Sequence, residues 1–316
     1  MSQLRSIPIP GSGRITLALL AVVPAVLAYP WRSTRDYVVL GIAVVVVVVL
    51  FGWWGGLYFT TILRRRLALT RRRGRPIPES DSDIGKTAET RTTALLRVGP
   101  PTGDHNVLPL PLIAGYLNAY GIRADTIRIT SRDTDARETW IGLTVSAADN
   151  LAALQARSSR IPLHETAQVA ARRLADHLRE IGWEASTVGA DDVPELLTST
   201  SGETWRGVRD GSYHLAAYRV SINDALPETL DQIRSYPARE TWTAIEIAGS
   251  GTRKTVAVAS AFLTDAQPAA AAPLAALTPQ RGNHLPALLA LDPLSTQRLD
   301  GHTEAPADLL TEVART

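Results

Sequence analysis

The sequence predicts an α+β protein in which an N-terminal two-helix transmembrane hairpin precedes a cytoplasmic domain of mixed helices and strands. Two long apolar runs lie near the N-terminus, a dense series of arginines follows them, and beyond about residue 91 apolar residues recur with the periods of helices and strands. The 316-residue chain contains no cysteine. A disulfide scaffold, a cysteine-ligated metal site and a cysteine nucleophile are therefore excluded.

Two apolar runs carry the transmembrane prediction. Residues 38–59 contain no charge, and an α-helix of that length covers roughly 33 Å, enough to cross a hydrocarbon core of about 30 Å. Residues 15–31 form a shorter run that contains Pro24, which membrane helices tolerate. A cleaved signal peptide is the alternative for this run, but Ala25–Ala28 lacks a good cleavage pattern and a second apolar run follows closely. We therefore expect spans at about 15–31 and 38–59, within a hairpin that covers residues 1–62.

The charge distribution predicts the orientation of this hairpin. Residues 1–75 hold 11 arginines and one acidic residue, Asp36, whereas residues 76–316 hold 22 basic and 30 acidic residues. Positive residues stay on the cytoplasmic side of a membrane, so both termini and the large domain are expected in the cytoplasm. Because the bilayer accounts for the arginines, nucleic-acid binding is disfavoured. The predicted membrane-interface anchors are Trp31, Trp53, Trp54, Tyr58, Arg64, Arg65, Arg66, Arg71, Arg72 and Arg73.

A polar region separates the hairpin from the predicted domain. Residues 63–90 are expected to form an arginine-rich juxtamembrane segment and a linker rich in Pro, Gly and Ser. In the helix expected at Glu165–Ile181, the apolar stripe comprises Ala170, Leu174, Leu178 and Ile181, and Gly182 ends the helix. The other elements expected in the first unit are strand Thr92–Val98, helix Leu110–Tyr120, strands Thr126–Ser131 and Thr139–Val145, and helix Asn150–Arg157.

A second unit is predicted to repeat the first. The string Ala136–Trp140 recurs as Ala238–Trp242, and each copy is expected to open a strand that follows a helix. Two diverged strand–helix–strand–strand units follow, at about 91–190 and 203–265, which together form a cytoplasmic domain over 91–265. The second unit contains strand Tyr213–Ser221, helix Leu226–Ser235, and strands Thr241–Ala248 and Thr255–Phe262. Residues 266–316 are expected to be an Ala/Pro spacer and a C-terminal tail, in which Leu285–Leu294 packs back on the domain and everything after Asp300 is loose.

The sequence provides no complete catalytic motif. Gly249–Thr255 resembles a phosphate loop, but no glycine precedes its lysine directly and the segment joins two expected strands, so a hairpin turn is favoured. The histidines show no metal-ligand spacing. Two Asp-x-Asp pairs, Asp81/Asp83 and Asp133/Asp135, lie in the linker and in a polar turn. We expect no catalytic, cofactor-binding or metal site. The alternative is a membrane-tethered, nucleotide-sugar-dependent transferase that uses Asp133 and Asp135 to hold a metal ion.

The sequences of several segments resemble those of the EccE family, whose members are membrane-anchored core components of the actinobacterial type VII (ESX) secretion machine. The resemblance is greatest to the paralogue of the system linked to iron acquisition. It implies a non-catalytic structural subunit at the inner (plasma) membrane that assembles with EccB, EccC and EccD in the lipid bilayer, with EccC as the ATPase. No nucleic acid and no small-molecule substrate are expected. The segments that carry it are Pro30-Trp31, Trp53-Trp54, Thr60-Thr61, Gly115–Leu117, Tyr120–Ile122, and residues 149–163, 172–183, 203–208, 240–246 and 274–296.

Overall fold

The computed structural model describes residues 12–27, 34–51, 53–54, 57–72, 90–101, 107–156, 162–198, 201–250 and 253–306. The chain divides into two compact units, Met1–Arg72 and Arg73–Thr316. Each unit is described by itself.

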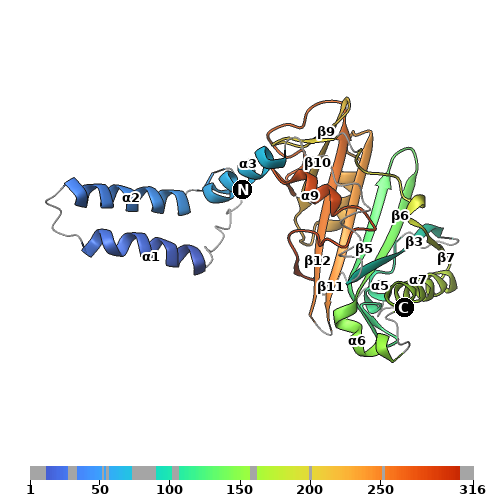
Figure 1. The fold of residues 1–316 in the computed structure, drawn as a ribbon. Coiled ribbons are helices and arrows are strands. Elements are labelled where there is room, and N and C mark those ends of the chain that lie inside the picture. Colours follow the sequence, from blue (N-terminus) through green and yellow to red (C-terminus); the bar gives the residue numbers. More distant parts are fainter. Residues whose placement is uncertain are drawn as a thin grey trace. The chain divides into compact units, whose positions relative to one another are not determined.

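The N-terminal unit is a pair of apolar helices followed by a third, arginine-rich helix. Helices α1 and α2 pack against each other (Figure 1). The short strands β1 and β2 pair antiparallel, with Trp53 opposite Tyr58. The elements are α1 (Ser12–Leu27), α2 (Thr34–Phe51), β1 (Trp53–Trp54), β2 (Leu57–Tyr58) and α3 (Phe59–Arg72).

The expected transmembrane hairpin is wrong. No helix among the described residues is both long and apolar enough to cross a membrane. Helix α1 has 16 residues, which corresponds to roughly 24 Å against a hydrocarbon core of about 30 Å. Helix α2 takes in the charged pair Arg35 and Asp36 at its start and ends at Phe51. Strands β1 and β2 then occupy the region where the second expected span, residues 38–59, would have continued as helix.

The second unit is built on a 12-stranded antiparallel sheet with the order β7-β3-β6-β5-β11-β12-β10-β9-β8, to which β4, β13 and β14 add at β5, β10 and β12. Figure 1 shows β5, β11 and β12 side by side in its middle. The elements are β3 (Arg91–Pro101), α5 (Leu110–Gly115), β4 (Asn118–Ala119), β5 (Ile122–Asp133), β6 (Arg137–Ser146), α6 (Ala147–Gln155), α7 (Leu163–Glu180), β7 (Trp183–Val188), η1 (Ala190–Asp192), β8 (Gly202–Glu203), β9 (Val208–Asp210), β10 (Tyr213–Val220), α8 (Leu226–Arg234), β11 (Glu240–Ser250), β12 (Arg253–Thr264), β13 (Leu277–Pro279), α9 (His284–Leu289) and β14 (Thr303–Glu304).

The two halves of the central sheet have the same strand order. In each half the strand that comes first in the chain lies outermost, the third lies next to it and the second lies at the centre. β3-β6-β5 on one side meets β11-β12-β10 on the other, and the two halves join where β5 pairs antiparallel with β11. In each half a helix, α5 or α8, separates the first strand from the antiparallel pair that follows. The repeated five-residue string does not mark this symmetry. Its first copy opens β6, which follows β5 through the turn at residues 134–136, so the expectation that each copy follows a helix is wrong for that copy.

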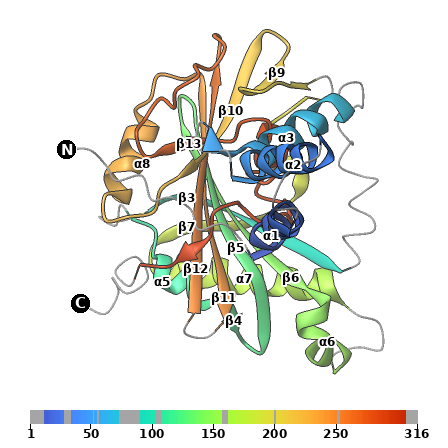
Figure 2. The same cartoon turned by 90° about the vertical axis from the view of Figure 1, so that its left-hand side faces the viewer.

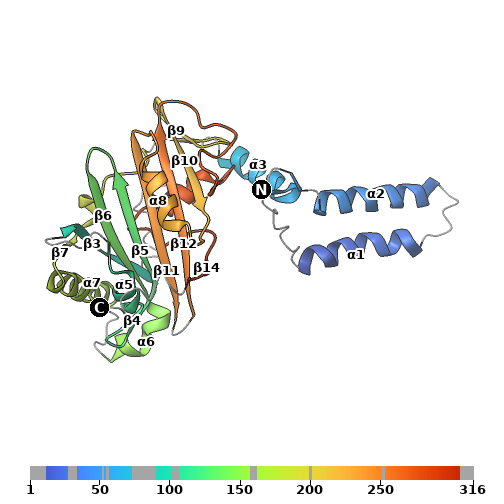
Figure 3. The same cartoon turned by 180° about the vertical axis from the view of Figure 1, so that it is seen from behind.

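Both faces of the sheet are buried. Helices α5, α7 and α8 cover one face, in a core that includes Leu96, Ile141 and Leu174. The segment around α9 covers the other face, over Trp140 and Trp242. Helix α9 lies in front of the sheet in Figure 1 and α8 lies in front of it in the reverse view of Figure 3, while α6 lies beside the ends of β5 and β6 (Figure 2). Burial on both faces explains why these strands are apolar almost without alternation.

Three local expectations differ from the structure. Helix α5 ends at Gly115 rather than Tyr120, because Asn118 and Ala119 form β4, which pairs with the start of β5. Tyr120 and Gly121 turn between these two strands in left-handed conformations, with φ of 55° and 72°. Ile181 follows the last residue of α7, is 37% exposed and does not belong to the buried stripe. Beyond Asp300 the chain is not loose over its described part, since β14 pairs with β12.

Candidate functional site

The predicted arginine anchors that the structure describes lie on α3. Arg64 and Arg66 are exposed and Arg65 is half-buried. Leu63 and Leu67, one helical turn apart, are 57% and 51% exposed, so α3 presents apolar and cationic side chains together, as helices at membrane surfaces do. For Trp53, Trp54, Tyr58, Arg71 and Arg72 the structure describes the backbone within β1, β2 and α3, and Trp31 and Arg73 lie outside the described residues.

Helices α1 and α2 expose an unusually apolar surface. Leu20 and Leu27 of α1 are 72% and 78% exposed. Many exposed large apolar side chains on two neighbouring helices are typical of regions that contact a partner protein or lipid. The other exposed large apolar side chains of the two helices are Leu19, Val23, Val26, Tyr37, Val38, Val39, Ile42, Val44, Val45 and Val48.

The acidic pairs that could have held a metal do not form a site among the described residues. Asp133 ends β5 and pairs with Arg137, whose Nε lies 3.6 Å from Asp133 Oδ1. Asp135 lies in the exposed turn between β5 and β6. The part of the chain that the structure describes contains no group of three His, Asp or Glu residues able to hold a metal ion. Asp81 and Asp83 lie outside that part.

The segment that resembles a phosphate loop joins two paired strands. Gly249 is opposite Lys254 in the hairpin of β11 and β12. Its φ is 116°, and a Cβ there would lie 2.2 Å from the Arg253 carbonyl oxygen, which explains why glycine occupies the position. The segment is not followed by a helix, so it lacks the helix N-terminus on which a phosphate loop depends.

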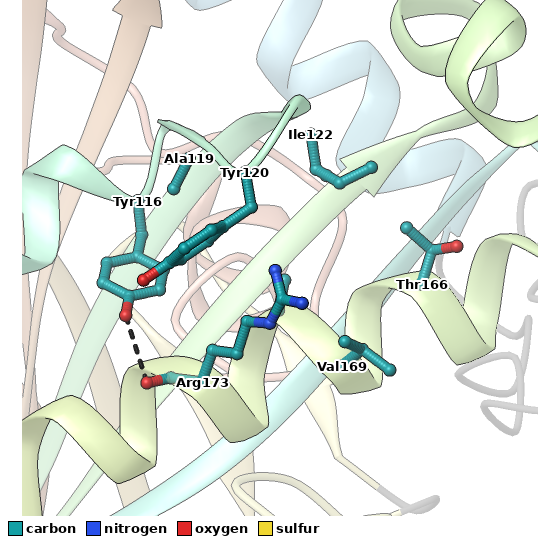
Figure 4. Close-up of a pocket in the computed structure, with 8 residues that line it drawn as sticks. Tyr116, Ala119, Tyr120, Ile122, Thr166, Val169 and Arg173 are labelled. Atoms are coloured by element: carbon teal, nitrogen blue, oxygen red, sulfur yellow. Dashed lines mark hydrogen bonds between the residues drawn. The ribbon is translucent and has the colours of Figure 1, made fainter.

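A small cavity of about 10 Å³ lies between α7 and the turn that leads into β5 (Figure 4). The Tyr116 hydroxyl donates a hydrogen bond to the Arg173 carbonyl oxygen over 3.1 Å, and the Arg173 guanidinium lies 4.5 Å from the centre of the Tyr120 ring. Burial, with a contribution from neighbouring Tyr120, raises the pKa of Tyr116 to about 12. The space holds at most a single water, so these contacts attach α7 to the sheet and do not form a ligand site.

A buried pair of opposite charges joins β5 to β11. Arg128 and Glu246 are opposite each other in the register of these strands, and their side chains are only 3% and 0% exposed. Arg128 Nε donates to Glu246 Oε2 over 2.9 Å. Arg128 Nη1 donates to the carbonyl oxygens of Asp292 and Ser295, over 2.9 and 2.8 Å, and Nη2 donates to that of Gln297. One buried guanidinium therefore holds the segment after α9 against the sheet.

The second oxygen of Glu246 continues this network. Glu246 Oε1 lies 2.9 Å from His302 Nε2 and accepts from the Leu299 amide over 3.3 Å. His302 Nδ1 lies 3.1 Å from the Thr255 hydroxyl. Burial alone would raise the pKa of Glu246, but the hydrogen bond from His302 and the charge of Arg128 together lower it below its ordinary value. Burial is the main influence on Asp292 and raises its pKa.

Sequence reasoning missed this network, which we call the Arg128–Glu246–His302 network. Its signal is a single charge inside an apolar strand, since Arg128 stands between two isoleucines in β5 and Glu246 stands between two isoleucines in β11. Such a charge is seldom buried without a partner. Its buried polar atoms are satisfied by groups of the chain itself, which suits a structural role.

Comparison with known proteins gives a consistent family. Residues 134–220 match the family described as "Putative type VII ESX secretion system translocon, EccE". The chain is 65% identical over 311 residues to the ESX-3 secretion system protein EccE3 of Mycobacterium tuberculosis (strain ATCC 25618 / H37Rv), covering 96% of this chain and 92% of that protein. It is 50% identical over 291 residues to the ESX-3 secretion system protein EccE3 of Mycolicibacterium smegmatis (strain ATCC 700084 / mc(2)155), covering 92% and 90%. The resemblance in the sequence is thus confirmed, and the chain belongs to the EccE family of type VII secretion system proteins.

Proposed function

We propose that this protein is a non-catalytic structural subunit of a type VII (ESX) secretion complex, where it docks on the core components EccB, EccC and EccD at the inner membrane. The observation that carries the proposal is the 65% identity to a named ESX-3 secretion system protein over 96% of the chain. Identity of that extent, spread along both units, supports the same role in a homologous assembly. The sheet unit supports it too, because its described buried charges are engaged in internal contacts.

We also propose that the N-terminal unit associates with the membrane. The exposed leucines and valines of α1 and α2 supply apolar surface, and Arg64, Arg65 and Arg66 of α3 supply positive charge beside Leu63 and Leu67. The anionic cytoplasmic leaflet attracts such a combination by about 1 kcal/mol for each arginine near its surface. The proposal concerns association and assigns no spanning segment. Trp31, Trp53, Trp54, Tyr58, Arg71, Arg72 and Arg73 remain predicted interface anchors on the same grounds.

Purification of the full chain from membranes tests both proposals. We expect a tagged chain, extracted in a mild detergent, to bring down EccB, EccC and EccD at a fixed ratio that mass spectrometry can measure. Reversal of Arg64 and Arg66 to glutamate should reduce the membrane-bound fraction, while reversal of the exposed Arg179 in α7 should not. Recovery of the chain without these components, or turnover of a nucleotide sugar by the purified chain, would contradict the proposed function.

A further inference from the structure

One edge of β3 is left open where β7 stops. β3 pairs with β6 from Arg91 to Val98, but its pairing with β7 begins only at Leu95, opposite Val188. Residues 91–94 therefore have a neighbouring strand on one side and, within the described chain, none on the other. An open strand edge of this kind can accept an added strand.

The main-chain groups at this edge point outward at two residues. The Ala147 amide donates to the Thr90 carbonyl oxygen over 2.8 Å, so the main-chain groups of Thr90, directly before β3, face the β6 side. In an antiparallel pair, the main-chain groups of successive residues alternately face the partner strand and face away from it. The N–H and C=O groups of Arg91 and Thr93 consequently face away from β6, toward the open edge. No main-chain hydrogen bond joins them to another described loop residue.

A slot of about 400 Å³ lies along this edge. Thr93, Ala94 and Leu95 of β3 line it, together with residues from both sides of the sheet. Leu294, which packs on the α9 face, forms one wall. The opposite wall belongs to α7. Its lining residues there are His164, Gln168, Ala171 and Arg172. The end of β7 adds Thr187 and Val188, and the chain that follows it adds Gly189 and Ala190. The slot thus continues the line of β7 between the two layers that cover the sheet.

The chemistry of the walls defines what fits. The Leu95 and Leu294 wall is apolar, whereas the α7 wall carries Arg172 and His164 and no acidic side chain lines the slot. Arg172 is exposed, and none of the ion pairs among the described residues includes it, while the neighbouring Asp176 pairs with Arg179. Successive side chains of an added strand point to opposite faces, so one set would meet the apolar wall and the alternate set would meet Arg172.

We propose that the open edge of β3 binds an extended segment of a partner protein as an added strand, with apolar and acidic residues alternating along it. Arg91 and Thr93 provide the main-chain hydrogen bonds, and Leu294 and Arg172 select the side chains. The inference rests on the proposed function for the source of the segment, which is another component of the secretion complex.

Hydrogen–deuterium exchange on the full chain, alone and within the purified complex, tests the inference. We expect the amides of Arg91 and Thr93 to exchange about tenfold more slowly in the complex, as an added main-chain hydrogen bond would cause. The edge strand β8 and its neighbour β9, at the other end of the sheet, should exchange equally in both samples. A photo-reactive residue at the exposed Ala190 should cross-link, in the same complex, to one short segment of another subunit.

Two matched pairs of variants separate strand addition from general damage. Thr93→Pro removes the outward N–H, which the pairing with β6 does not use, and should abolish the Ala190 cross-link. Thr93→Val removes only the hydroxyl and should retain it. Arg172→Glu should weaken the cross-link, while Arg179→Glu on the same helix should leave it unchanged. Ala190→Trp fills the slot from an exposed position and should displace the segment without unfolding the chain.

The outcomes distinguish this inference from the proposed function. An intact complex in which Arg91 and Thr93 show no added protection would contradict the inference alone. Cross-links to a second copy of this chain, or to this chain itself, would also overturn it. Recovery of the chain without any partner would contradict the proposed function and remove the source of the segment with it.

Discussion

Arg128 and Glu246 show how a charge pair can be kept inside a sheet. Taking two charges out of water costs several kcal/mol for each ion, and mutual attraction offsets this only when their other hydrogen-bonding positions are filled. Here the remaining N–H groups of the Arg128 guanidinium donate to carbonyl oxygens of the segment after α9. The second carboxylate oxygen of Glu246 contacts His302 Nε2 and accepts from the Leu299 amide. The pair is therefore tied to the position of the C-terminal segment.

Glu246→Ala should be among the most destabilising single changes in the sheet unit. It leaves Arg128 buried without its counter-charge, and removal of one partner from such a pair costs about 3–5 kcal/mol. We expect a clear drop in the urea midpoint of the full chain. The matched control is Asp176→Ala, which breaks the exposed pair with Arg179 and should cost less than about 1 kcal/mol. Equal effects of the two changes would show that the Arg128–Glu246–His302 network contributes no more than a surface pair.

The two carboxylates of this region should respond to pH with opposite signs. The pKa of Glu246 is lowered on folding, so its contribution to stability is complete above its ordinary value of 4.5 and is lost as the pH falls through the lower folded value. The pKa of Asp292 is raised by burial above 3.8, so its contribution is present at low pH and is lost as the pH rises through the folded value.

Asp292→Asn provides the corresponding measurement. The amide oxygen can still accept from the Leu294 amide, as Asp292 Oδ1 does over 2.8 Å, while the buried charge is removed. We expect a higher melting temperature than that of the unmodified chain at pH 7, and a difference that shrinks as the pH approaches 3.8, the ordinary value for this carboxyl. A variant that melts lower at pH 7 would indicate that the charge of Asp292 stabilises Arg128 by more than its burial costs.

Among the elements, α7 separates what periodicity predicts from what packing decides. The period of apolar residues places the helix and its face correctly at Leu174 and Leu178, both fully buried. It errs at the end, because Gly182 in a left-handed conformation ends the helix and leaves Ile181 at the turn. The apolar period assumes that the helix continues through Ile181, whereas α7 ends at Glu180.

Leu174→Asp and Ile181→Asp test this assignment. The first places an unpaired carboxylate in the core between α7 and the sheet and should cost several kcal/mol, enough to lower the melting temperature strongly or to unfold the unit. The second places the same charge at a position that is 37% exposed and should change stability by less than about 1 kcal/mol. Thermal melting followed by circular dichroism compares them, and similar losses would mean that both residues face the core.

The sequence pattern predicts the individual strands but not the order in which they pair in the sheet. Runs of apolar and β-branched residues located β3, β5, β6, β10, β11 and β12. Their order depends on pairing between residues far apart, as in Arg128 opposite Glu246, for which local pattern offers no guide. The repeated string also misled, because its two copies flank β5 without occupying equivalent strands. Trp140 and Trp242 nevertheless stack, with ring centres 6.0 Å apart, and Arg132 pairs with both Glu138 and Glu240.

In the N-terminal unit the elements themselves were predicted wrongly, because the apolar runs predicted two membrane-spanning helices that the described residues do not contain. Hydropathy over residues 15–31 and 38–59 measures composition, whereas a spanning segment also needs an unbroken helix of sufficient length. Both helices of this pair begin before those runs, at Ser12 and Thr34, and end inside them, at Leu27 and Phe51. The interface anchors depended on the same reasoning, and the arginines that the structure describes are placed on α3, a helix that the sequence analysis did not foresee.

At the scale of the whole molecule, the C-terminal segment completes the sheet unit instead of trailing from it. β13 pairs with β10 and β14 pairs with β12, and Gly142 of β6 leaves room for the Pro293 carbonyl oxygen, which a Cβ there would approach to 2.3 Å. Burial on the second face of the sheet thus depends on residues that lie far along the chain from the strands they cover. The sheet unit should accordingly require residues up to about 306 to fold.

Because the chain divides into two compact units at Arg72, we expect the second unit to fold without the first. The two units are separate compact clusters. The buried residues of both hydrophobic cores of the sheet lie between Ala94 and Leu299, and none of them comes from α1 to α3. We expect a chain that begins at Arg73 to retain a cooperative urea transition with the same midpoint and the same near-ultraviolet signal from Trp140 and Trp242. The same truncation should leave the membrane fraction and lose fixed-ratio recovery with EccB, EccC and EccD, because it lacks the apolar helices and the α3 arginines. A truncated chain that unfolds would show that the sheet unit depends on the first seventy-two residues, and one that still assembles would place the docking contacts on the sheet unit alone.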